Sequence, residues 1–97
     1  MASFAITHFF EGGTQEQYEN TVKVVHPDGG TRLPQGQLYH AAGPTGDGWQ
    51  IVATWDSEEA WEQFRDNKLL PGFEQVDNGL PAPPEETTFS IANEQSQ

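Results

Sequence analysis

The order of strand and helix signals along the 97 residues is the feature that most limits how this chain can fold. Four β-prone segments and two amphipathic helix patterns follow one another in the order β-α-β-β-α-β. The strands are predicted at residues 3–10, 37–42, 49–55 and 87–92, and the helices at residues 14–26 and 56–70. This order is typical of the ferredoxin-like α+β fold, in which a four-stranded antiparallel sheet carries two helices on one face. A chain of this length makes one domain, so residues 1–97 are assigned to a single unit.

Capping signals predict where both helices begin. Thr14 and Gln17 have the spacing of a capping box, in which the two residues satisfy each other's free backbone N–H groups. Asp56 and Glu59 have the same spacing, so we expect Asp56 to cap the second helix.

Glycine and proline predict where the regular elements stop. Pro71 is expected to end the second helix. Residues 43–48 are rich in glycine and predict a long hairpin tip between the second and third strands. Residues 79–86 contain three prolines and are expected to form an extended linker outside the core.

Apolar residues are few but large, with 34% hydrophobic and 11% aromatic residues in the chain. Aromatic side chains must therefore supply much of the buried surface. Residues 3–10 place apolar side chains on both faces of their strand, although two helices can cover only one face of the sheet. A second copy of the same sheet is the economical cover for the other face. We therefore expect a homodimer with an isologous interface.

A formal net charge of −11 opposes binding to nucleic acids and to anionic membranes, because both are polyanions. We expect neither as a partner. The charge fits simple solubility, and the scarcity of Lys and Arg also fits a high-salt habitat. The chain has no cysteine, which excludes disulfides and thiolate chemistry. The first residues lack the pattern of a signal peptide, and no stretch of ~18 apolar residues occurs. A cytoplasmic location is the resulting expectation.

Two histidines in predicted strands are the best candidates for catalysis. His40 and, after it, His8 are predicted to handle protons if both imidazoles project from the same side of the sheet into an apolar cavity. A neutral imidazole there could remove a proton from an acidic phenol or enol. Each histidine could instead be a hydrogen-bonded sheet residue or part of a dimer contact.

Four aromatic residues could form a wall that stacks on a flat, small hydrophobic or aromatic molecule. They are Trp55, Trp49, Tyr39 and Phe10. The same residues could equally be the core of a dimer.

His26 is expected in the last turn of the first helix, where the helix dipole favours a cation. His26 and Asp28 lie two positions apart, but no third ligand accompanies them. We therefore expect no metal site.

Residues 53–61, ATWDSEEAW, resemble the strand-to-helix junction of the antibiotic biosynthesis monooxygenase family, which belongs to the dimeric α+β barrel superfamily. The opening strand, followed by Gly12, Gly13 and a helix from Thr14, is similar as well. The resemblance implies a monooxygenase without a cofactor that acts on aromatic or polyketide-like substrates. It also implies that Trp55 belongs to the wall of the substrate pocket.

Two positions depart from the pattern of that family. Its members often carry a glutamate where this chain has Ala53, and a histidine where it has Phe64. Both departures favour an alternative, a dimeric ligand-binding or accessory domain without turnover. A further alternative is haem handling, with a histidine of the cavity as the axial ligand.

Overall fold

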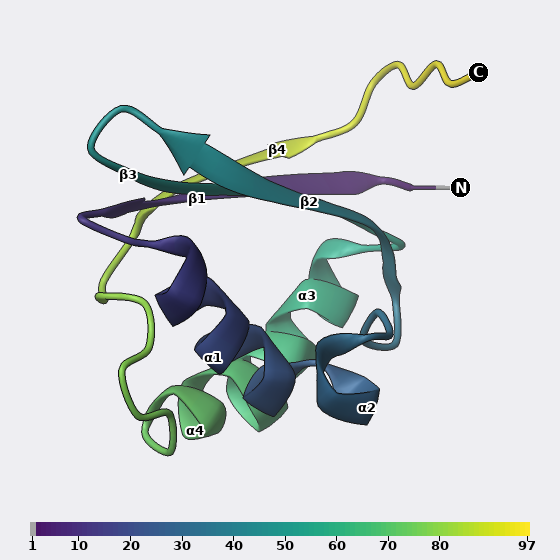
Figure 1. The fold of residues 1–97 in the computed structure, drawn as a ribbon. Coiled ribbons are helices and arrows are strands. Elements are labelled where there is room, and N and C mark those ends of the chain that lie inside the picture. The colour runs from purple at the N-terminus through teal and green to yellow at the C-terminus, as the bar shows by residue number, and fades with distance from the viewer. Residues whose placement is uncertain (1) are drawn as a thin grey trace.

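The computed structural model describes residues 2–97, and its elements follow the predicted order (Figure 1). The strands are β1 (Phe4–Glu11), β2 (Gln37–Thr45), β3 (Gly48–Trp55) and β4 (Glu85–Ser90). The helices are α1 (Gln15–Val25), α2 (Pro27–Gly30), α3 (Glu58–Phe64) and α4 (Leu70–Phe73), with a π-helical turn η1 (Arg65–Leu69) between the last two. The sheet order is β2-β3-β1-β4, and all neighbours are antiparallel. All helices lie on one face of the sheet (Figure 1), which confirms the ferredoxin-like α+β class.

The start of α1 is as predicted, whereas the start of α3 is one residue later than predicted. The Thr14 hydroxyl accepts a hydrogen bond from the N–H of Gln17 at 3.2 Å, and the Gln17 side chain accepts one from the N–H of Thr14 at 3.0 Å. The predicted cap of the second helix, Asp56, is wrong. The hydroxyl of Ser57 accepts from the N–H of Ala60 at 3.1 Å, because that free N–H lies three positions after Ser57.

Pro71 does not end the second helical segment, which continues through η1 and α4 to Phe73. The reason is a wide turn in η1, where the N–H of Leu70 bonds to the carbonyl of Arg65 five residues earlier. Pro71 then lies in the first turn of α4. Proline is tolerated at this position, because the backbone N–H groups of a first turn have no hydrogen-bond partner within the helix. Leu69 in η1 and Phe73 at the end of α4 both pack against core residues.

A β-bulge in β2 decides which of its side chains face the helices. Gln37 pairs with Trp55, but the next pair in the ladder joins Tyr39 to Thr54, so one extra residue is inserted. As a result Gln37 is buried beneath the helices, whereas Leu38 and Tyr39 are both exposed. Further along, β2 and β3 pair as far as Thr45 and Gly48, so the hairpin tip is shorter than predicted.

Residues 79–86 are not a linker outside the core, because Leu80 is buried. Its side chain forms a cluster with Phe10 and Trp49. The backbone N–H of Leu80 also donates to the hydroxyl of Thr21 in α1 at 3.0 Å. This segment therefore closes one side of the space between the sheet and the helices.

The face of the sheet opposite the helices is uncovered in the single chain (Figure 1). Large apolar side chains are exposed there, by 37% for Val52 and by 56% for both Tyr39 and Phe89. In the ladders, Val52 pairs with Thr7 and Phe89 pairs with Ala5, which places both on this outer face. This apolar surface is what the sequence predicts for a sheet that needs a second cover.

Candidate functional site

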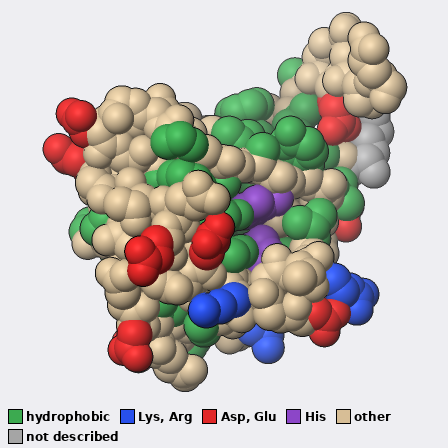
Figure 2. Space-filling model, in the orientation of Figure 1, with side chains coloured by type: hydrophobic (Ala, Val, Ile, Leu, Met, Phe, Trp, Pro, Cys, Tyr) green, Lys and Arg blue, Asp and Glu red, His purple; other side chains and the backbone are tan. Residues whose placement is uncertain are grey.

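A cavity of about 270 Å³ lies between the inner face of the sheet and helices α1, α3 and α4. Its volume is close to the lower limit for small-molecule sites. The wall is mostly apolar and includes Ile6, Phe10, Trp55, Trp61, Phe64 and Phe73. His8, His26 and His40 also line it. Histidine side chains are visible in a hollow between the sheet and the helices (Figure 2).

Tyr18 and His40 form a hydrogen-bonded pair in this cavity. The hydroxyl of Tyr18, on α1, lies 2.6 Å from Nε2 of His40, on β2. Burial raises the pKa of Tyr18 and lowers the pKa of His40, so both side chains are neutral at pH 7. Nδ1 of His40 is buried and has no hydrogen-bond partner within residues 2–97. If Nε2 carries the proton and donates it to the tyrosine oxygen, the lone pair of Nδ1 is available to a ligand.

His26 is buried and neutral, which corrects the expectation of a cation at the end of α1. Its ring meets the ring of His40 edge-on at a centroid distance of 4.9 Å. Burial lowers the pKa of His26 to about 4, and repulsion from His40 in its protonated form adds to this effect, against an opposing backbone hydrogen bond at Arg32. The sequence carried no signal for this contact, since His26 and His40 are brought together only by the fold.

His8 lies on the cavity wall but is held by a different partner. Its Nε2 is 2.9 Å from a carboxylate oxygen of Glu86, its neighbour across the β1–β4 ladder. The ring also lies 5.4 Å from the ring of Trp61. Both predicted histidines thus reach the same cavity, and the proton-handling role of each stays a prediction.

The four predicted wall residues do not all reach the cavity. Phe10 and Trp55 line it, and Trp49 is buried beside it, 5.3 Å from the ring of Tyr18. Tyr39 lies on the opposite face of the sheet, because adjacent strand residues alternate in direction and its neighbour His40 faces the cavity. Tyr39 is therefore not part of this cavity. Tyr18 was not predicted as a site residue, although Tyr18, Val22 and Val25 have the i, i+4, i+7 spacing of an apolar helix face that turns towards a sheet.

Three buried polar atoms of cavity residues have no hydrogen-bond partner within residues 2–97. They are Oε1 of Gln37, Nδ1 of His40 and Nε1 of Trp55. A fourth such atom, Nε1 of Trp49, belongs to a residue outside the cavity wall. Buried polar groups in native proteins are nearly always satisfied, and either water or the polar group of a ligand in the cavity would satisfy these three atoms.

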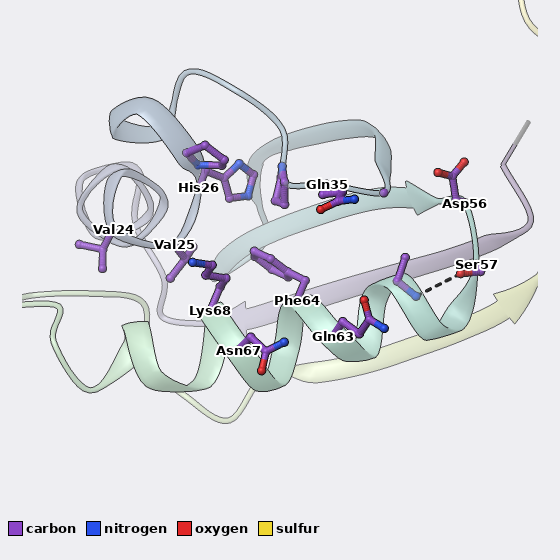
Figure 3. A pocket seen from close by; sticks show the side chains of 14 residues that line it. Val24, Val25, His26, Gln35, Asp56, Ser57, Gln63, Phe64, Asn67 and Lys68 are labelled. Atoms are coloured by element: carbon purple, nitrogen blue, oxygen red, sulfur yellow. Dashed lines mark hydrogen bonds between the residues drawn. The ribbon is translucent and has the colours of Figure 1, made fainter.

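A second, wider groove of about 620 Å³ lies between α3 and η1 on one side and the end of α1 with residues 34–36 on the other (Figure 3). Polar side chains such as Gln35, Gln63 and Asn67 line it. His26 and Phe64 line both this groove and the inner cavity, so they form the wall between the two spaces.

Two kinds of feature do not occur in the part of the chain that the structure describes. Among residues 2–97, no group of three or more His, Cys, Asp or Glu side chains has the arrangement of a metal site. None of the helices in this range combines the length and the apolar character that crossing a bilayer requires.

Fold and cavity together define a small α+β protein with a ligand-sized pocket between its sheet and its helices. Three solved structures share this fold. Rv0793 from Mycobacterium tuberculosis has 16% sequence identity and a TM-score of 0.67, and the match covers 98% of this chain and 100% of that one. SnoaB, a cofactor-independent oxygenase from Streptomyces nogalater, has 12% identity and a TM-score of 0.63, and the match covers 98% of this chain and 97% of SnoaB. An anthrone oxidase-like protein has 18% identity and a TM-score of 0.58, covering 95% of this chain and 45% of its own.

No family model matches this sequence, and a comparison with curated proteins gives no match. The structural likeness therefore describes the fold. It extends over the whole βαββαβ arrangement that frames the cavity.

Proposed function

We propose that this chain is a cofactor-independent monooxygenase that acts on an aromatic or polyketide-like substrate with an acidic phenol or enol. The observation that carries the proposal is the Tyr18–His40 pair, with its hydroxyl 2.6 Å from Nε2 inside an apolar cavity. An imidazole that is neutral at pH 7, with one nitrogen free, has the properties of a general base. The fold shared with SnoaB, a cofactor-independent oxygenase, supports the same reaction class.

In the proposed reaction, Nδ1 of His40 takes a proton from the activated CH₂ or enol of the substrate. The imidazolium that forms keeps its Nε2–H donated to the oxygen of Tyr18, which holds the ring in place. The carbanion transfers electrons to molecular oxygen and forms a peroxide at carbon. The imidazolium returns its proton to the peroxide. Loss of the second proton from the same carbon then breaks the O–O bond, and the hydroxide that leaves takes up a proton to form water, so CH₂ and O₂ become C=O and H₂O. The apolar wall limits the access of water to the reactive carbanion.

A homodimer is part of the proposal. Val52, Tyr39 and Phe89 supply exposed apolar surface on one face of the sheet. The same face of a second chain is complementary to it by symmetry. Such a contact would cover this face. The cavity lies on the opposite face of the sheet, so its walls would be formed by one chain alone.

Oxygen uptake with anthrone and dithranol tests the proposed reaction. We expect uptake above the rate in buffer alone, formation of the ketone or quinone in equal amount, and no accumulation of hydrogen peroxide. His40→Ala should reduce the enzymatic rate by about 10²-fold or more, the range for a lost general base. His8→Ala should reduce it less, because His8 is already engaged by Glu86. Unchanged uptake in His40→Ala would show that the assignment of the base is wrong.

The second candidate is a ligand-binding domain without turnover. Ala53 and Phe64 favour it, because both line the cavity where related proteins often carry a glutamate and a histidine. Saturable binding of aromatic ligands, with no oxygen uptake for any of them, would support this candidate over the enzyme.

A further inference from the structure

Gln37 and Trp55 are direct neighbours in the ladder between β2 and β3. Side chains that face each other across an antiparallel pair have Cβ atoms about 4.5–5.5 Å apart. Both residues are more than nine-tenths buried, with exposed fractions of 7% for Gln37 and 0% for Trp55. Both also line the cavity.

Each of the two side chains has a polar atom without a partner. Oε1 of Gln37 is an acceptor and Nε1–H of Trp55 is a donor, and neither has a hydrogen bond within residues 2–97. A buried donor and a buried acceptor on paired residues, both unsatisfied, are costly to the fold. A single hydroxyl group can satisfy both, because it accepts one hydrogen bond and donates another.

We propose that Gln37 and Trp55 together bind one hydroxyl group of the aromatic ring that occupies the cavity. The pair thereby selects phenolic rings over rings that are unsubstituted or etherified. The inference deepens the proposed function and rests on it in one respect, since it assumes that the same cavity holds the substrate.

The position of the pair along β2 gives the bound hydroxyl a role in orientation. Because of the bulge, Gln37 and His40 are successive residues of β2 on the cavity wall. A hydroxyl held at Gln37 fixes one end of the ring and presents its remainder towards His40. Gln37 is thus a positioning residue, and such positioning contributes to the rate by keeping the reacting atoms in place.

A bound water molecule could satisfy the same two atoms, so the experiment must separate a water site from a ligand site. The probes are α-naphthol and its methyl ether, which keep the ring and the oxygen but differ in the ability to donate a hydrogen bond. Titration calorimetry on the full chain gives the Kd of each. We expect the wild type to bind α-naphthol about tenfold to hundredfold more tightly, the range for one buried polar group left unsatisfied. Equal affinities for the two probes would overturn the inference.

Gln37→Met keeps the length of the side chain and removes the acceptor. We expect this variant to lose most of the preference for α-naphthol over its methyl ether. The matched control is Gln50→Met, on the adjacent strand and outside the cavity wall, which should keep the full preference. A preference that survives in Gln37→Met would overturn the assignment.

The Tm of the protein without ligand distinguishes a glutamine that binds the ligand from one that only stabilises the fold. Because Oε1 of Gln37 makes no hydrogen bond to any of residues 2–97, Gln37→Met should have a Tm equal to or higher than that of the wild type. A clear fall in Tm would mean that the amide supports the fold, and would overturn the inference. If neither naphthalene probe binds the wild type, the inference is also wrong, whereas oxygen uptake and its loss in His40→Ala decide separately on the proposed function.

Discussion

The hydroxyl of Tyr18 and Nε2 of His40 are 2.6 Å apart although one residue lies on α1 and the other on β2. One turn further along α1, Thr21 connects the helix to the segment of residues 79–86. Its hydroxyl donates to the carbonyl of Gln17 and accepts from the N–H of Leu80. The short distance therefore depends on the packing of the residue 79–86 segment against the helix. Removing the hydroxyl tests the pair without removing the ring.

Tyr18→Phe should lower the rate of oxygen uptake by about tenfold or more, because the imidazolium of His40 loses its hydrogen-bond acceptor. The ring remains packed 5.3 Å from Trp49, so circular dichroism should be unchanged. Tyr39→Phe is the matched control, since Tyr39 is exposed on the other face of the sheet, and it should keep the wild-type rate. Equal losses in the two variants would argue against a specific role for the Tyr18 hydroxyl.

The free energy of unfolding should fall as the pH decreases from about 6.5 towards 4. The pKa of His26 is lowered from 6.5 to about 4 in the folded chain, so in this window the unfolded chain binds a proton that the folded chain does not. The slope for one such group is about 1.4 kcal/mol per pH unit. The lowered pKa of His40 acts in the same direction.

Urea unfolding at a series of pH values measures this slope. His26→Gln should flatten it between pH 6.5 and 4, because glutamine does not titrate in this range. A slope that is the same in the variant and the wild type would mean that other groups cause the pH dependence.

Oxygen uptake should persist below pH 6.5, because the lowered pKa keeps His40 neutral there. The rate should decline only as the pH falls through the lowered pKa, where the base takes up a proton before it meets the substrate. A pH–rate profile of kcat/KM measures this limit. A decline centred above pH 6.5 would contradict His40 as the base.

Gly36→Ala should destabilise the fold by about 1–3 kcal/mol. Gly36 has a φ of +89°, and an added Cβ would lie 2.7 Å from the Cβ of Ala60 on α3. Gly43→Ala is the control, because Gly43 has no positive φ and no atom within 4 Å of an added Cβ. Chemical denaturation of both variants measures the difference, and equal stabilities would contradict the close approach of the loop to α3.

Phe89→Glu should convert a dimer into a monomer, because it places a charge within the apolar sheet face. Leu33→Glu makes the same kind of change at an exposed leucine in a loop, and it should leave the dimer intact. Sedimentation of each variant at micromolar concentration measures the molar mass. A wild-type chain that sediments as a monomer would refute the proposed dimer.

The sequence predicted those parts of the fold that depend on local patterns. The order of strands and helices and the capping box of Thr14 follow from periodicity and from side-chain chemistry within a few residues. The bulge at Leu38 could not be predicted, because one inserted residue in a strand leaves no local signature and shows only in the pairing with β3. That single residue brings Gln37 to the same side as His40, whereas Tyr39 faces away because it is adjacent to His40 in the strand.

The sequence indicated which types of residue line the candidate site, but it did not indicate which of their side chains contact one another. His8, singled out by its strand parity, and Trp55, singled out by the likeness around it, both line this cavity. The contacts of His40 with Tyr18 and His26 join residues from β2, from α1 and from the end of α1. No sequence spacing encodes such contacts, because they depend on how the helix packs against the sheet.

The extra residue in β2 also lets this strand tolerate one change of length. If Leu38 were deleted, the ladder with β3 could run without interruption, and Gln37 and His40 could keep their present partners Trp55 and Ala53. The two residues would then be two positions apart and would still share one side of the strand. In a comparison of natural variants, chains that lack the additional position are therefore expected to keep the same internal chemistry, whereas a regular strand with the present spacing would place the two side chains on opposite faces.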